Sequence, residues 1–204
     1  MMIIPEDERC REIPLEGPGI LTHPDMMKAL EWIFECYQPP VKKYAVFLPC
    51  SVRKPYHESP SHKLFDSVVF KYLPREDTHI VVFGTCGIVP RELDEEYPFS
   101  HYKFVLGKCT IPEIKETFVE IETERISRYL LKTRNNYKVR IAYCLGEVRE
   151  AMKRASEQTN IHVHILPKRL IKSGKKFPYG SLSQPHYLDE LGMFLSELVR
   201  REDR

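Results

Sequence analysis

A dense group of reactive side chains lies between residues 49 and 62. This stretch reads PCSVRKPYHESPSH and combines one thiol, three serine hydroxyls, two cations, a tyrosine and two histidines. Arg53 and Lys54 follow Cys50 closely, and neighbouring cations lower the pKa of a thiol and increase its thiolate fraction. Because a thiolate attacks electrophilic carbon, the pattern predicts Cys50 as a nucleophile. The alternative is that Cys50 is only a small, buried residue at the end of a strand.

The same stretch contains a helix start. Ser59 and Pro60 favour it, with serine as the N-cap and proline at the first helical position. His62 then lies in the first turn, where the positive end of the helix dipole favours a neutral imidazole that can accept a proton. The simpler alternatives are that Ser59 only caps the helix and that His62 is solvated.

Strands and helices alternate around this group. Short apolar runs predict buried strands over residues 44–48, 80–83, 139–145 and 161–166, with 101–106 as a further candidate. Helical spacing of apolar residues predicts helices over about 25–37, 60–72, 111–131, 147–157 and 185–200. This order predicts an α/β fold with three α/β/α layers and a mainly parallel central sheet. Ligands bind such sheets beyond the carboxyl ends of the strands, which here means the loops after Leu48, Phe83 and Leu145.

Length and composition fit one globular unit. The 204 residues, with 42% hydrophobic and 29% charged residues, predict an N-terminal arm over 1–22 and a single core domain over 23–204. A net charge of +2 restricts any nucleic-acid surface to a local patch. The six cysteines form no C-x-x-C pair, so we expect neither a zinc site nor another metal or cofactor. No signal peptide or membrane span is visible, which predicts a cytoplasmic protein without a membrane partner.

A basic segment lies between the last strand and the last helix. Residues 167–183 contain no acid and carry Lys168, Arg169, Lys172, Lys175 and Lys176. Phe177 and Tyr179 add aromatic rings, and cations with aromatics suit a surface that follows an RNA backbone. A solvated basic loop is the alternative.

The spacing of the reactive group matches a known family. The pattern Pro-Cys-x3-Lys-Pro-Tyr-x2-Ser-x2-His, from Pro49 to His62, resembles the signature of archaeosine synthase, a family related to tRNA-guanine transglycosylase. The stretch from Gly87 to Leu93, followed by Tyr97-Pro98 and His101-Tyr102, is similar too, as are residues 23–40. The resemblance covers roughly residues 20–165 and allows a uracil-DNA-glycosylase-like arrangement of the sheet.

The resemblance implies a tRNA-modifying transferase of archaeosine biosynthesis. Its substrate is tRNA carrying 7-cyano-7-deazaguanine, whose nitrile receives an amine and becomes an amidine. Lysine is the implied donor, with glutamine also considered, and a radical SAM protein then releases archaeosine. On this scheme Cys50 forms a thioimidate, and His62 or Lys54 protonates the nitrile nitrogen. A non-catalytic tRNA- or base-binding module and a glycosylase-like enzyme on nucleobases remain the alternatives.

The implied substrate contacts come from two loops. Glu92 would accept the two donors on the edge of the base, or alternatively complement a helix dipole. Tyr56 would stack on the base, or alternatively pack in the loop. Arg53 and Ser59 complete the expected substrate-binding set. Longer family members also carry a transglycosylase-like region and an RNA-binding PUA domain, for which this chain leaves no room, so we expect a split enzyme with a separate PUA-containing chain.

Overall fold

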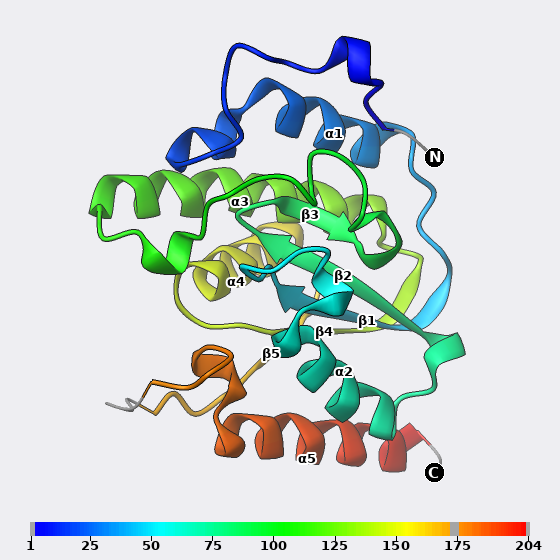
Figure 1. Ribbon diagram of the computed structural model, residues 1–204. Helices are drawn as coiled ribbons and strands as arrows, with labels where there is room; N and C mark the ends of the chain where they lie inside the picture. Colours follow the sequence, from blue (N-terminus) through cyan, green and yellow to red (C-terminus); the bar gives the residue numbers. More distant parts are fainter. Residues whose placement is uncertain (1–2, 172–175, 203–204) are drawn as a thin grey trace.

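A five-stranded sheet forms the centre of the protein, seen in a computed structural model that describes residues 3–171 and 176–202 (Figure 1). The strands are β1 (Lys42–Pro49), β2 (Thr78–Gly84), β3 (Gly87–Pro90), β4 (Tyr137–Tyr143) and β5 (His164–Leu166), in the order β3-β2-β1-β4-β5. β1 runs parallel to β2 and β4, and β4 runs parallel to β5. β3 alone pairs antiparallel, with β2. The mainly parallel sheet is therefore confirmed.

Helices cover both faces of the sheet. α3 (Pro112–Lys132) and α4 (Gly146–Thr159) pack together on one face, and α1 (Pro24–Glu35) packs beside α3 near β3. α2 (Pro60–Tyr72) and α5 (Pro185–Glu202) pack together on the other face (Figure 1). Each predicted helix is present, and the three-layer α/β/α arrangement is confirmed. The further expectation of a uracil-DNA-glycosylase-like arrangement stays a prediction.

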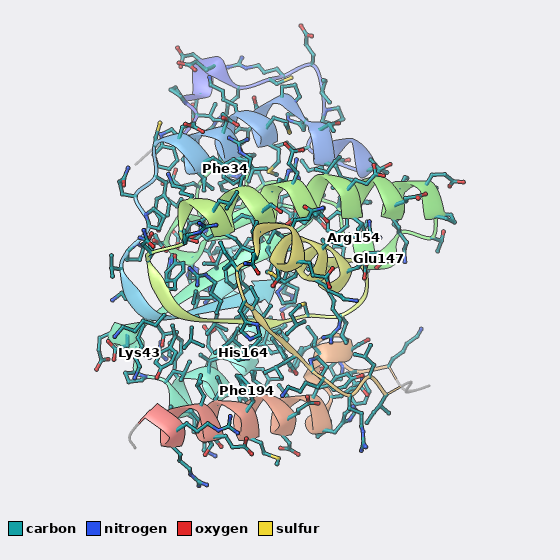
Figure 2. The ribbon with its side chains drawn as sticks, turned by 180° about the vertical axis from the view of Figure 1, so that it is seen from behind. Phe34, Lys43, Glu147, Arg154, His164 and Phe194 are labelled. Carbon is teal, nitrogen blue, oxygen red and sulfur yellow. The ribbon has the colours of Figure 1, made fainter. Side chains whose placement is uncertain are left out.

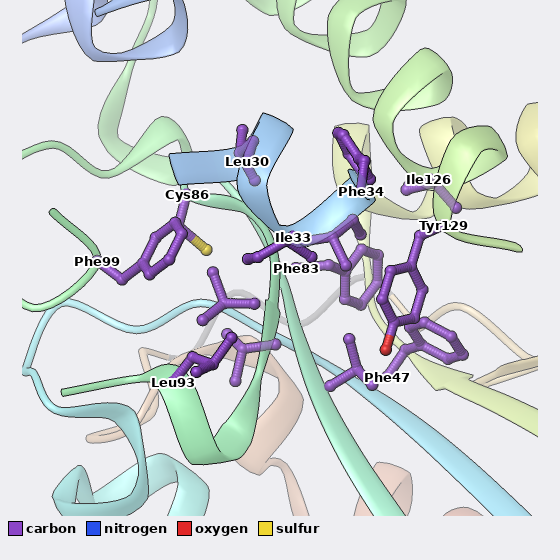
Figure 3. Packing of buried hydrophobic residues seen from close by; sticks show 14 of the residues in the cluster. Leu30, Ile33, Phe34, Phe47, Phe83, Cys86, Leu93, Phe99, Ile126 and Tyr129 are labelled. Atoms are coloured by element: carbon purple, nitrogen blue, oxygen red, sulfur yellow. The ribbon is translucent and has the colours of Figure 1, made fainter. Parts of the chain in front are cut away.

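The alternation of side chains along β1 divides the core into two layers. Tyr44 and Val46 face the layer of α2 and α5, whereas Ala45 and Phe47 face the layer of α1, α3 and α4. Phe47 lies edge-on to the rings of Phe83 and Tyr129, with ring centroids 6.1 and 6.3 Å apart (Figure 3). On the opposite face, the ring of His164 in β5 lies 5.0 Å from that of Phe194 in α5 (Figure 2). Because β1 is buried on both faces, it reads as a continuous apolar run.

The N-terminal residues pack onto this core. Two short 3-10 helices, at Glu6–Glu8 and Pro18–Thr22, precede α1. Ile4 and Ile20 have no exposed surface and belong to the cluster of α1 and α3. Within the described residues, no helix is both long and apolar enough to cross a bilayer.

One strand prediction is wrong. Residues 101–106 form no strand, and a single bridge between Lys103 and Glu16 is their pairing. The edge of β2 is taken instead by β3, which follows a two-residue turn at Thr85 and Cys86. Such a local hairpin forms more readily than a distant pairing. The loop that the sequence predicts after Phe83 is this hairpin turn.

Candidate functional site

The predicted ligand edge of the sheet carries a cavity of about 750 Å³. The loop after β1 forms one wall, with Cys50, Arg53 and Ser59 among its lining residues. Leu145, after β4, and Tyr179, before α5, form other parts of the lining. Loops from the carboxyl ends of neighbouring parallel strands thus meet here. A second cavity of about 410 Å³ shares Val52, Val105 and Lys108 with the first and adds Lys54 and Tyr102.

The backbone around Cys50 is held by β2. The Cys50 N–H donates to the carbonyl of Phe83 at 2.8 Å, which extends the β1–β2 pairing past the end of β1. Gly84, next along β2, has a φ of 129°, and a Cβ at this position would lie 3.1 Å from Cys50 Sγ. Glycine therefore lets the turn approach the thiol closely. Cys50 as a residue is partly buried and lines the cavity.

Hydrogen bonds from a neighbouring turn stabilise the Cys50 thiolate. A hydrogen bond from the Cys86 thiol has the largest effect, and the Thr85 hydroxyl, the Thr85 N–H and the Tyr102 hydroxyl add to it. Together they outweigh burial and lower the pKa of Cys50 to about 6. The sequence indicated cations as the cause, but these donors lie 35 to 52 positions further along the chain. Burial and the Cys50 thiolate raise the pKa of Cys86, so Cys86 stays a donor.

Lys54 lies beside these donors. Its Nζ stands 3.7 Å from the centroid of the Tyr102 ring, an arrangement in which the ring face attracts the cation. Burial lowers the pKa of Lys54, while the charges of Cys50 and Cys86 oppose that effect. The Lys54 ammonium can therefore give up its proton more easily than a solvated lysine. A negative charge on Cys50 makes that proton harder to lose.

Tyr56 does not face the cavity. Its side chain has no exposed surface, its hydroxyl pairs with that of Tyr102 at 2.8 Å, and its ring lies 5.8 Å from that of His62. This burial fits the alternative that Tyr56 packs in the loop, and its stacking on a base stays a prediction. The half-exposed ring of Tyr179, which lines the cavity, is the available aromatic surface there.

His62 is buried behind the cavity, in the first turn of α2. Ser59 caps this helix by accepting the His62 N–H at 3.3 Å, as the sequence predicts. The His62 ring bonds the Pro49 carbonyl through Nε2 at 2.9 Å and contacts an Arg91 guanidinium nitrogen through Nδ1 at 2.8 Å. Burial, together with the Arg91 charge, lowers the pKa of His62 to about 3. The imidazole is therefore neutral, with both nitrogens already occupied.

Glu92 lies near the amino-terminal end of β2, at the end of the parallel strands opposite the cavity. Its carboxylate accepts from the Tyr37 hydroxyl and pairs with His79 Nε2 at 3.1 Å. His79 lies near the start of β2, five residues before Gly84, which corresponds to about 16 Å along a strand. The antiparallel β3 thus carries residues 91–93 away from Cys50, and the base-reading role of Glu92 stays a prediction.

The predicted cations divide into two groups. Arg53 is exposed at the first cavity, where Lys108 adds a second cation. Lys168, Arg169 and Lys176 are exposed on the segment that leads to Tyr179. Lys172 and Lys175 lie outside the described residues. Among the described residues that line the first cavity there is no Asp or Glu. Groups of three or more His, Cys, Asp or Glu that could hold a metal are likewise absent from the described part of the chain.

Sequence reasoning missed four residues around the thiol. Thr85 and Cys86 belong to the loop predicted after Phe83, and the sequence predicts no role for them or for Tyr102. Glu122 is fully buried and accepts the Gly84 N–H at 3.0 Å. A signal for Glu122 exists in the sequence, because it lies one helical turn from both Phe118 and Ile126 on the apolar stripe of α3.

A family model covers most of this architecture. Residues 27–173, which include the Cys50 loop, the hairpin and Glu122, match the family described as "Domain of unknown function (DUF5591)". The chain belongs to the DUF5591 family. The DUF5591 match ends before Tyr179 and α5, so these parts of the cavity wall and helix layer lie outside it.

Curated relatives of this DUF5591 protein are archaeosine synthases or their alpha subunits. Archaeosine synthase subunit alpha of Methanosarcina acetivorans is 31% identical over 144 residues, covering 70% of this chain and 22% of the relative. The protein of that name from Thermoplasma acidophilum is 38% identical over 82 residues, or 40% of this chain and 16% of its own length. Archaeosine synthase of Haloferax volcanii is 32% identical over 120 residues, or 58% and 19%. The chain thus matches about a fifth of the length of these relatives.

A solved structure has a similar fold. The crystal structure of AF0587, a protein of unknown function, superposes with a TM-score of 0.55 and 19% identity, covering 81% of this chain and 48% of that one. At this identity the likeness supports the fold alone.

Proposed function

We propose that this DUF5591 domain is the nitrile-modifying core of a tRNA transferase of archaeosine biosynthesis. The observation that carries the proposal is the position of Cys50, which lines the cavity at the carboxyl end of β1, lies against Gly84 and has a pKa lowered to about 6. The thiolate of Cys50 is the nucleophile that addition to a nitrile requires. The kinship with archaeosine synthase subunit alpha supports the substrate class that the motif from Pro49 to His62 implies, tRNA that carries 7-cyano-7-deazaguanine.

The first step forms a carbon–sulfur bond. The Cys50 thiolate attacks the nitrile carbon, and the electron pair of one C–N π bond moves to the nitrile nitrogen. That nitrogen takes a proton from the Lys54 ammonium, which leaves a neutral thioimidate and a neutral Lys54 amine. We assign this proton to Lys54 because the neutral His62 has no free nitrogen. His62 then serves to position the loop.

The second step transfers the amine. The neutral Lys54 removes a proton from the ammonium of the donor, for which we propose the side chain of free lysine. The resulting amine attacks the thioimidate carbon, and the carbon–sulfur bond breaks. The products are an amidinium and the Cys50 thiolate, so protons and charge balance and Lys54 has returned to its ammonium form. A radical SAM protein would then act on the adduct.

The cation-lined cavity fits a nucleic-acid substrate. Arg53 and Lys108 line it together with the exposed ring of Tyr179. Cations bind phosphates, and an aromatic ring in the same cavity offers a surface for an unstacked base. The segment with Lys168, Arg169 and Lys176 extends this positive surface away from the cavity.

A mass assay on tRNA tests the proposal. Nitrile-bearing tRNA is incubated with lysine and either the wild type, Cys50→Ser, or the control Cys36→Ser, whose thiol is exposed at the end of α1. We expect a lysine adduct on the tRNA with the wild type and with Cys36→Ser, and at least a hundredfold loss with Cys50→Ser, in the range typical of removing a catalytic group.

Three other results would contradict the proposal. Full activity of Cys50→Ser would exclude covalent catalysis by this thiol. Binding of tRNA without any adduct would favour the non-catalytic module, and release of the free base would favour a glycosylase-like enzyme. The assay is run with and without a PUA-containing partner chain and a radical SAM protein, so that a missing partner is not mistaken for a missing activity.

A further inference from the structure

Glu122 is a fully buried carboxyl group, and one of its two oxygens has no hydrogen bond within the described residues. This oxygen is Oε2, and the side chain belongs to α3. Arg125, one turn further along α3, lies 3.8 Å from that oxygen, and its Nη1 has no hydrogen-bond partner there either. Unpaired buried polar atoms destabilise a fold, so natural proteins keep them mainly where they serve a function.

The contacts of Glu122 lead to Cys50. Glu122 Oε1 accepts the N–H of Gly84 at 3.0 Å. A Cβ on Gly84 would lie 3.1 Å from Cys50 Sγ, so the peptide that Glu122 holds is next to the thiol. Thr85 follows directly in the turn, and its N–H and hydroxyl are among the groups that lower the pKa of Cys50. Glu122 therefore stands one residue away from two of the four donors.

We propose that Glu122 is a positioning residue, whose carboxyl oxygen holds the Gly84 peptide so that the Thr85 N–H and hydroxyl point at Cys50. This inference rests on the proposed role of Cys50. Arg125 keeps the Glu122 side chain in place from the other side, because its Nη2 donates to the Leu21 carbonyl and contacts Met27 Sδ at 3.3 Å.

On this proposal, Glu122 positions the Gly84 peptide through its hydrogen bond and not through its charge. Burial is the main cause that raises the pKa of Glu122 to about 8, and the Cys50 thiolate adds to the effect. At neutral pH the carboxyl group therefore carries its proton, and a glutamine amide resembles it in charge, size and accepting oxygen. Aspartate keeps the carboxyl but is one methylene shorter, so it cannot reach the Gly84 N–H without a shift of the backbone.

Two substitutions of Glu122 separate the effect of side-chain length from the effect of its charge. The apparent thiol pKa of Cys50 is measured from iodoacetamide alkylation rates between pH 4.5 and 9, by mass spectrometry of the Cys50 peptide, with exposed Cys36 as internal reference. We expect Glu122→Gln to leave this pKa near that of the wild type, and Glu122→Asp to raise it by about one unit, as loss of a hydrogen bond to a charged group does. Glu120→Gln, an exposed neighbour on α3, is the matched control.

Each outcome decides the inference. An unchanged thiol pKa in Glu122→Asp, or an equal rise in Glu122→Gln, overturns it: the first shows a merely structural residue and the second a role through charge. Should Glu122→Asp not fold, Glu122→Met, which fills the same space without an acceptor, takes its place with the same expected rise. Alkylation needs no tRNA, so this result is independent of the transfer assay.

Discussion

The reactivity of Cys50 depends on hydrogen-bond donors that the chain brings from a distance. Arg53 and Lys54 are its neighbours in sequence, yet the lowered pKa of Cys50 comes first from Cys86 and then from Thr85 and Tyr102. Donors aimed at a thiolate act over a short range and keep it reactive at neutral pH. The cations are thus available for the roles proposed for them, proton transfer by Lys54 and substrate binding by Arg53.

Removal of the Cys86 donor should make Cys50 less acidic. We expect Cys86→Ala to raise the apparent pKa of Cys50 above its value of about 6, while Cys86→Ser, which keeps a donor of similar size, leaves it within a few tenths of a unit. The measurement is the pH dependence of Cys50 alkylation, in variants whose thermal unfolding is cooperative. An unchanged profile in Cys86→Ala would show that Cys86 is not the donor.

At the scale of elements, His62 joins the end of β1 to α2. Its ring bonds the Pro49 carbonyl on one side and Arg91 on the other, and Arg91 pairs in turn with Asp66 at 2.8 Å. Arg91 belongs to a short 3-10 helix, Arg91–Leu93, that follows β3. The loop that carries Cys50 is thus fixed between three elements, which favours a rigid nucleophile.

Acid should break this junction. The pKa of His62 is about 3 in the folded protein and about 6.5 in the unfolded chain, so the unfolded chain binds the proton more readily. The stability from a neutral His62 is fully present above pH 6.5 and is lost as the pH falls towards 3, by up to about 1.4 kcal/mol per pH unit. Urea unfolding between pH 4 and 7 measures the slope. We expect a shallower slope in His62→Gln, and no change in the exposed control His101→Gln.

The basic segment before α5 should act through charge alone. Reversal of Lys168, Arg169 and Lys176 to glutamate should weaken tRNA binding and reduce the salt dependence of the binding constant by about one slope unit per lost phosphate contact. Lys71, Lys138 and Lys153, exposed and outside both cavity linings, form the matched control triple. An equal loss in both triples would assign the effect to net charge and remove this segment from the RNA surface.

At the scale of the whole molecule, we expect this domain to bind RNA weakly by itself. A net charge of +2 with few cations around the cavity offers few phosphate contacts, on which RNA affinity largely depends. We propose that a separate PUA-containing chain supplies further tRNA binding and raises the local concentration of substrate at Cys50.

Modification rates at limiting tRNA test whether a PUA-containing chain supplies tRNA binding to this domain. We expect this chain alone to modify tRNA slowly at low concentration, and a PUA-containing partner to lower the tRNA concentration needed for half the maximal rate at least tenfold, the lower range of tethering effects. The maximal rate itself should change little, since the reacting groups lie in this chain. A partner without effect on either quantity would show that the domain binds tRNA sufficiently by itself.

Much of the architecture follows from local pattern. Four of the five strands, all five helices and the Ser59 cap are predictable, because apolar periodicity and capping depend on residues within one or two turns of each other. The edge of the sheet that holds the site is predictable too, since parallel strands present their carboxyl ends together. The Cys50 loop is recognisable because its reactive residues are contiguous in the sequence.

The environment of each side chain was decided only by the tertiary structure. Tyr56 and Glu92 carry suitable chemistry, yet one is buried and the other lies at the opposite end of the parallel strands, because local hairpin pairing at β3 turned the chain away from Cys50. Cys86 and Glu122 lie 36 and 72 positions after Cys50 and reach it through the β2–β3 turn and the buried face of α3. Periodicity shows which side chains face the core. It does not show which of them meet there, since that depends on how distant elements cross and pack.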